Sequence, residues 1–318
     1  SILFLIGLIR EILLGGVKTI VTFSSWDFVS ENKWARWPAL PWTVVAAGAM
    51  LLGYSLKGKG LAMLAGFSTI YISVFGQWEP SMETLSFVLI AAPISVILGV
   101  ALGIWAHRNT AVETALNPLL NVMQTMPHFS YLVPVMVLFG IGDHAGAIAT
   151  IIFATPPMVR LTVLGLKRVS PEVVEAGMMS GCSNFQLLFK VLIPTARRDI
   201  LIGVNQVIMQ CLAMAVIASF IGAKGLGHNL LLALNGLKIG AAIEQGICIV
   251  LIAIVLDRMS LAWANKQTDY FADLTFFKRH KNSLVFVGIF VVGIVFAYIG
   301  TLIFREGFNY LYIVPHNK

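Results

Sequence analysis

The chain has 318 residues, of which 58% are apolar and only 12% are charged. Soluble globular domains carry about 25% charged residues, so this composition excludes an ordinary soluble enzyme and predicts a polytopic membrane protein. The formal net charge of +7 is accounted for by Lys and Arg in cytoplasmic loops, so we expect a lipid bilayer and no nucleic acid as partner. The three cysteines form no cluster with histidine, which predicts neither a disulfide nor a bound metal.

The first 38 residues do not form a clear span. Residues 1–21 are apolar but carry Arg10, Glu11 and Lys18, a pattern that favours an interfacial helix or the tail of one more span. Residues 22–42 place four tryptophans between charged side chains, which is typical of the headgroup level of a membrane.

Eight apolar stretches follow, most of them close to the ~20 residues that cross a bilayer core of about 30 Å. They cover residues 39–56, 60–77, 84–106, 114–141, 143–166, 199–222, 239–258 and 282–304. Prolines in the fourth stretch predict kinks or a broken helix, and Pro156-Pro157 predicts a bend in the fifth.

Basic residues between the spans set the orientation. They gather in four alternate loops, at Lys57, Lys59, Arg108, Lys167, Lys190, Arg197 and Arg258. If these loops are cytoplasmic, the spans alternate without contradiction. The loops at 78–83 and 142–143 and the segment 223–238 then face outward.

A polar stretch, PEVVEAGMMSGCSNFQLLFKVLIP at residues 171–194, separates the fifth and sixth spans. Ser170 can cap a helix, Pro171 suits its first turn, and Gly181 is a stop signal. A second apolar stripe is closed by Pro194. The pattern predicts a helix, a glycine turn and a second helix, lying on the membrane surface and offering a docking face.

The spacing in this stretch resembles the EAA loop of ABC-importer permeases, whose pattern is EAA-x3-G-x9-I-x-LP. Gly177 stands at the second alanine, and Val191 and Ile193 stand at the closing Ile and Leu. The resemblance implies a coupling helix that sits in a cleft of an ATPase subunit. It assigns the coupling role to Glu175, Ala176, Gly177, Gly181, Ile193 and Pro194. The alternative is a cytoplasmic amphipathic hairpin of some other membrane protein.

Three further runs, at 121–142, 149–166 and 203–227, resemble the glycine betaine/proline/choline branch of the type I importers. This resemblance implies an all-α, polytopic transmembrane bundle in the bacterial inner membrane. It divides the chain into 1–83 with two flanking spans, a permease core at 84–258, and 259–318 with an extra last span. It also implies a second permease copy, ATPase subunits and a substrate-binding protein. The solute would be glycine betaine, choline, proline or a related amine such as trimethylamine N-oxide.

No ATP site is visible in the chain. The run GAKGLGH at 222–228 lacks the Lys-Ser/Thr pair of a phosphate-binding loop. We therefore expect no enzymatic activity and no cofactor on this chain, with ATP and magnesium bound by a partner ATPase. An ion-coupled secondary transporter is the rival interpretation, but it would need buried acids, and only Glu244 comes near. An intramembrane enzyme lacks any matching motif.

Polar residues at membrane depth are candidates for the solute pathway, because hydrocarbon makes them costly without a purpose or partner. The candidates are the polar residues Gln124, Asn205, Gln206, Gln210 and Ser219, together with the flexible and polarizable side chain of Met123. The alternatives are hydrogen bonds between helices and, for methionine, ordinary packing. Arg160, near the cytoplasmic end of its span, is expected to reach the membrane surface and anchor the helix.

Overall fold

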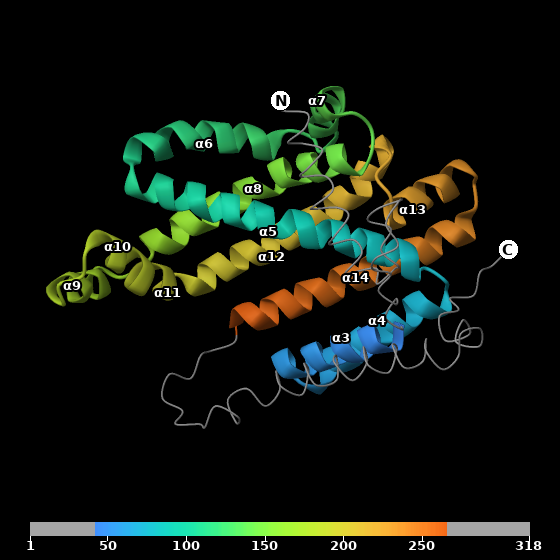
Figure 1. Ribbon diagram of the computed structural model, residues 1–318, viewed down its shortest axis with the longest axis horizontal. Helices are drawn as coiled ribbons and strands as arrows, with labels where there is room; N and C mark the ends of the chain where they lie inside the picture. The colour runs from blue at the N-terminus through green and yellow to red at the C-terminus, as the bar shows by residue number, and fades with distance from the viewer. Residues whose placement is uncertain (1–41, 266–318) are drawn as a thin grey trace, which may run out of the picture.

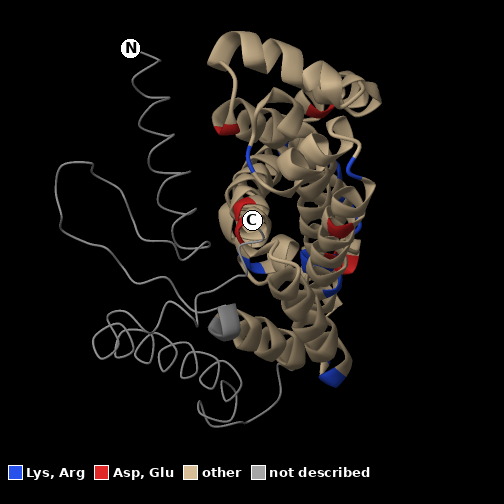
Figure 2. Ribbon diagram, turned by 90° about the vertical axis from the view of Figure 1, so that its right-hand side faces the viewer, with Lys and Arg blue, Asp and Glu red and all other residues tan. Residues whose placement is uncertain are grey.

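The computed structural model describes residues 42–265, and every element in this range is helical. The predicted interfacial helix at 1–21, the tryptophan-rich stretch up to residue 41 and the last predicted span at 282–304 lie outside the described residues. Figure 1 shows the remaining helices running largely side by side as one elongated bundle. In Figure 2 the ribbon is mostly tan, with few blue and red segments, as expected for a body that lies in a membrane.

Two short helices come first. α3 (Trp42–Lys57) and α4 (Lys59–Val74) are joined at Gly58, whose φ of +86° is in the left-handed region. α4 has 16 residues, and at 1.5 Å per residue this gives about 24 Å, less than the ~30 Å hydrocarbon core. The helix in the predicted span at 60–77 is therefore shorter than this core, and the described part of the predicted span at 39–56 is equally short.

Four helices of the described part are long and apolar enough to cross a membrane. They are α5 (Trp78–Arg108), α8 (Asp143–Lys167), α12 (Arg197–Ile217) with its 3₁₀ extension η3 (Ala218–Ile221), and α14 (Ile239–Asn265). α8 continues as one helix through Pro156 and Pro157, so these prolines do not break it.

A further pair of apolar helices is sharply bent. α6 (Thr110–Thr125) and α7 (Phe129–Phe139) qualify as a span only together, and they are bent by 101°. Pro127 lies at the break, where its missing N–H cannot continue a helix. The predicted irregularity of the stretch 114–141 is confirmed.

The centre of the bundle is the packing of α8 between α5 and α12. Met158 of α8 is fully buried there. A Cβ added at Gly99 of α5 would lie 2.5 Å from the Met158 Cβ, and one added at Gly203 of α12 would lie 2.9 Å from the Met158 sulfur. Glycines at these two positions therefore let the helix backbones approach closely, as is common for helices packed in membranes.

Three segments predicted to face outward meet at one end of the bundle. The Lys224 N–H donates to Asp143 Oδ1 at 2.7 Å, and the Leu226 N–H donates at 2.9 Å to Thr84 Oγ1, next to the segment 78–83. The segment at 223–238 is not an irregular loop, because it contains the helix α13 (Leu226–Asn235). The basic turns and the stretch 171–194 lie toward the opposite end (Figure 1).

Candidate functional site

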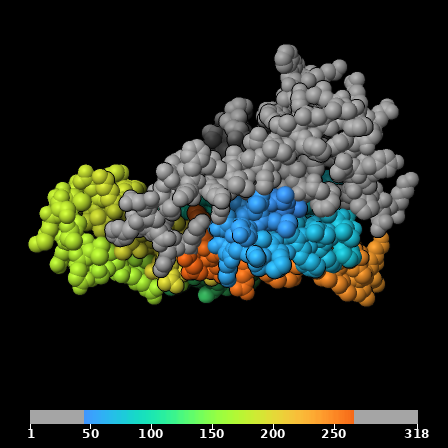
Figure 3. Space-filling view, turned by 90° about the horizontal axis from the view of Figure 1, so that it is seen from below, coloured from blue at the N-terminus to red at the C-terminus, as the bar shows by residue number. Residues whose placement is uncertain are grey.

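Residues 171–194, hereafter the coupling segment, project beyond the bundle at the end opposite to α13 (Figures 1 and 3). α9 (Pro171–Met179) comes first, and Gly181 turns the chain with φ at +76°. A second helix follows as α10 (Asn184–Gln186), the π-helix η2 (Leu187–Leu192) and α11 (Ile193–Thr195). The predicted succession of helix, glycine turn and second helix is confirmed.

The two helices begin in different ways. Ser183 and Gln186 form a reciprocal capping box at the second helix, in which the Ser183 N–H donates to Gln186 Oε1 at 3.0 Å. Ser170 stands at the N-cap of α9 but caps no backbone N–H with its side chain, contrary to our expectation. A hydrogen bond from the Glu172 backbone, aided by the Ser170 hydroxyl, instead lowers the pKa of the Glu172 carboxyl.

The second helix does not close at Pro194. Pro194 lies inside α11, which extends to Thr195, and the chain turns at Ala196 into α12. The π-helical turn ends at Leu192, just before a proline that cannot donate to the Lys190 carbonyl as a regular helix would require. Single π-helical turns of this kind occur often at functional sites.

Gly177 holds the two halves of the segment together. It is the buried residue of α9, and a Cβ at this position would lie 2.7 Å from Leu187 Cδ1 of η2. Leu188 of η2 packs into a small core with Leu166 of α8 and Ala196. The departure from alanine in the family pattern therefore has a steric reason, because α9 lies directly against η2.

Other predicted coupling residues lie around this contact. Glu175 and Ala176 are exposed on α9, Gly181 and Pro194 are exposed, and Ile193 is half-buried against the Leu166 core. An ion pair at the base joins Arg168, just after α8, to Asp199 at the start of α12, with 3.6 Å between Nη1 and Oδ2. The segment is thus fixed to two spans at once.

The coupling segment exposes several large apolar side chains among its charged and polar ones. Met179 is 91% exposed and Phe185 is 64% exposed. Phe185 and Phe189 lie ring against ring, with 4.5 Å between their centroids. Met178 is exposed as well, and we call these four exposed side chains of the coupling segment the apolar face: Met178, Met179, Phe185 and Phe189. A patch of this kind outside the membrane-spanning body marks an interaction surface.

The six pathway candidates are not brought together. Met123 and Gln124 lie on α6, whereas three lie on α12 and Ser219 lies on η3. Asn205 is buried and donates to Asp257 Oδ1 of α14 at 3.2 Å, while the Ser260 hydroxyl donates to Asn205. Ser219 donates to the Val216 carbonyl at 2.7 Å.

The two glutamines of α12 differ. Gln206 is exposed, whereas Gln210 has a buried Oε1 without a hydrogen-bond partner among the described residues. Sequence reasoning missed Asp257, although a carboxylate near the end of an apolar stretch was a visible signal for a polar contact between helices.

Comparison with known proteins places the chain in a family. Residues 95–268 match the family of the binding-protein-dependent transport system inner membrane component. The trimethylamine N-oxide transport system permease protein TmoV of Pelagibacter ubique is 64% identical over 315 residues, which are 99% of this chain and 44% of that protein. The glycine betaine transport system permease protein OpuAB of Bacillus subtilis is 43% identical over 223 residues, which are 70% of this chain and 78% of that protein.

The chain spans less than half the length of TmoV. A solved structure of the MetNI methionine ABC transporter in an inward-facing conformation shares the fold, with a TM-score of 0.55 at 17% identity. The aligned region covers 61% of this chain and 97% of the MetNI transporter chain. The resemblance drawn from the coupling segment is thereby confirmed, and the chain belongs to the family of binding-protein-dependent transport system inner membrane components, as a multi-pass inner-membrane permease of the ABC importers.

Proposed function

We propose that the chain is the membrane-spanning subunit of an ATP-driven importer for a small compatible solute. Two copies would form the pathway, a binding protein would deliver the solute at the α13 end, and partner ATPase subunits would bind ATP and magnesium at the coupling end. The chain itself performs no covalent chemistry in this scheme. The solute class follows from the relatives, whose names give trimethylamine N-oxide and glycine betaine as their cargo.

The observation that carries the proposal is the apolar face of the coupling segment. It lies outside the apolar bundle, at the end where positive charge gathers and which is therefore cytoplasmic. A soluble partner that covers Phe185 and Phe189 would remove aromatic area from water, which favours association. An ATPase subunit with a matching cleft is the partner that the family membership supplies.

Force can pass from this face into the membrane through a short route. α9 packs on η2 through Gly177, and Leu188 of η2 packs on Leu166, one residue before the end of α8. The Arg168–Asp199 ion pair links the same region to α12. Movement of the ATPase cleft would therefore tilt α8 and α12 together and change which side of the membrane has access to the pathway.

The experiment is reconstitution with the partner ATPase and binding protein. The double variant Phe185→Ser/Phe189→Ser should lose ATPase binding and uptake while remaining inserted and folded. Phe67→Ser is the matched control, since Phe67 is 60% exposed on α4, away from the coupling segment. Uptake should require ATP and persist when ion gradients are abolished. Normal ATPase binding by the double variant would contradict the proposal.

A further inference from the structure

One face of α6 carries a polar stripe that the proposed coupling route does not use. Four members lie on α6 at intervals of three or four residues, Glu113, Asn117, Asn121 and Gln124, and a fifth, His128, follows at the break before α7. Residues at this spacing share one face of a helix. Four of the five are exposed, although they belong to a broken crossing. Polar side chains at membrane depth face water or a polar partner and do not face lipid.

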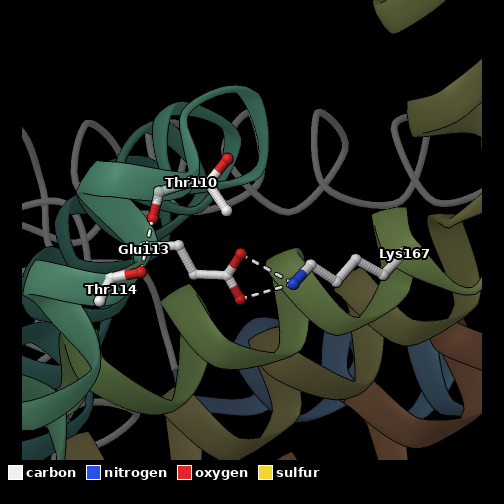
Figure 4. A network of polar contacts seen from close by, with 4 residues as sticks. All are labelled: Thr110, Glu113, Thr114 and Lys167. Carbon is white, nitrogen blue, oxygen red and sulfur yellow. Dashed lines mark hydrogen bonds and ion pairs between the residues drawn. The ribbon is translucent and has the colours of Figure 1, made fainter.

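The stripe faces α8 at three levels. Glu113 accepts two hydrogen bonds from Lys167 Nζ, at 2.6 and 2.7 Å (Figure 4). Arg160 donates to Asn121 Oδ1, and the rings of His128 and Phe153 lie 4.4 Å apart. On α8 the three partners follow one another at steps of seven residues, which is one helix face. We call this contact between α6 and α8 the polar seam.

A pocket opens within the polar seam. Its volume is about 280 Å³, and its lining includes Glu113, Asn117, Arg160 and Lys167. This volume far exceeds the roughly 10–15 Å³ that a cavity needs to hold one water. The pocket therefore has room for a small solute with part of its hydration shell.

The charge of this pocket is not balanced. Lys167 is neutralised by Glu113. Arg160 forms no ion pair among residues 42–265, and its Nε is buried without a hydrogen-bond partner there. It lies seven residues before Lys167, which corresponds to about 10 Å along the helix toward the membrane centre. If Arg160 only anchored its helix at the membrane surface, its guanidinium would not need to bind the neutral amide of Asn121 on a neighbouring helix. Nor would its Nε need to stay buried without a hydrogen-bond partner.

We infer that the polar seam is part of the solute route and that Arg160 determines specificity, favouring solutes that carry an anionic oxygen over net cations. A carboxylate or N-oxide oxygen can accept charge-assisted hydrogen bonds from the guanidinium, including its free Nε. A quaternary amine without such an oxygen meets only the repulsion of the uncompensated charge. This inference rests on the proposed transport function and names the solute class of that function.

Uptake by reconstituted importer tests it. For each solute, the rate of a variant is divided by the wild-type rate, so that the selectivity of the binding protein cancels. Arg160→Gln should lower this ratio at least tenfold for glycine betaine and trimethylamine N-oxide, but leave it near one or higher for choline. Arg160→Lys should retain most uptake. Arg108→Gln is the matched control, because it removes a cation in the last turn of α5 that does not line the pocket, and it should not change selectivity.

Thiol labelling gives a second readout that does not depend on transport. In a Cys182→Ser background, Asn117→Cys should react with a water-soluble, membrane-impermeant thiol reagent, and glycine betaine should protect it. Leu119→Cys is the control, because Leu119 is 54% exposed but points away from the polar stripe. Equal loss of all solutes in Arg160→Gln, or an unreactive Asn117→Cys, would overturn the inference. A wild type that takes up no solute with ATP would instead refute the proposed function.

Discussion

Gly165 of α8 and Asp199 of α12 meet at the base of the coupling segment. A Cβ added at Gly165 would lie only 2.9 Å from the Cβ of Asp199, so the two backbones are in contact there. The Asp199 carboxylate also pairs with Arg168, three residues after Gly165. Because the coupling segment leaves α8 and returns into α12, this contact closes the loop at its base. Any force applied to α9 reaches two spans at a point where they cannot slide freely.

Gly165→Ala should therefore weaken coupling more than it weakens folding. The added carbon meets another Cβ, which cannot rotate away, so the spans must separate by a few tenths of an ångström. Overpacking of this kind costs about 1–3 kcal/mol. We expect fewer solutes transported per ATP hydrolysed, with the complex still assembled. Gly246→Ala is the control, because nothing lies within 4 Å of a Cβ at that site in α14. Unchanged coupling in Gly165→Ala would show that the contact is not part of the force route.

Substitution of Gly181 should impair function because of its backbone conformation, and not because a new side chain would clash with its neighbours. Its φ is +76°, and nothing lies within 4 Å of an added Cβ. A left-handed conformation costs a non-glycine residue about 1–2 kcal/mol, least for asparagine. Gly181→Val should therefore impair ATP-driven uptake more than Gly181→Asn. Gly58→Val provides the same strain at the α3–α4 turn, at a φ of +86° and in open space. It should lower stability without uncoupling, and equal uncoupling by both valine variants would contradict the prediction.

The coupling segment was predictable because its signals are local. Pro171, Gly181 and the spacing to Pro194 act on neighbouring residues, and the structure has the helices and the turn at those places. The π-helical turn was not predicted, although Pro194, which cannot donate to the Lys190 carbonyl, was a local signal for it. The contacts of η2 with Gly177 and Leu166 join residues of different helices and were not predictable. A glycine in the sequence marks a position where the backbone can turn into a left-handed conformation. The packing between helices that are distant in the sequence has no such local signal.

The polar seam also has one part that could be predicted from the sequence and one part that could not. The four polar residues of α6 and His128 recur at helical spacing in the sequence, so the stripe itself could have been found. Its partners could not, because Arg160 is 39 residues from Asn121 and Lys167 is 54 residues from Glu113. Charge alone suggested that Arg160 anchors its helix at the membrane surface. Only the fold shows that it contacts another helix and lines a pocket.

The two glycines that contact Met158 should not be equivalent. At Gly99 an added Cβ would meet the Met158 Cβ and Cγ at 2.5 and 2.6 Å, whereas at Gly203 it would meet the mobile sulfur at 2.9 Å. Methionine can move its thioether but not its Cβ. Gly99→Ala should therefore cost about 1–3 kcal/mol of unfolding free energy, and Gly203→Ala clearly less. Thermal unfolding in detergent measures both; in a Met158→Ala background, which keeps the Cβ but removes the sulfur, Gly99→Ala should remain costly and the cost of Gly203→Ala should fall. Equal costs would show that the core yields at both sites.

Asn205 should contribute to the stability of the bundle through its hydrogen bond to Asp257. The Asn205 amide donates to the Asp257 carboxylate of α14 and accepts from Ser260, so it joins two spans inside the bundle. Asn205→Leu would remove this donor from the Asp257 carboxylate, which is half-buried and 3.9 Å from Arg258, and loss of a hydrogen bond to a charged group costs about 1.5–3 kcal/mol. Asp257→Asn keeps an acceptor at the same place and should be milder. The double variant Asn205→Leu/Asp257→Leu should recover part of the loss, because neither group then remains unpaired. If Asn205 instead contacts solute directly, Asn205→Leu would lower uptake with unchanged unfolding temperature, and the double variant would not recover activity.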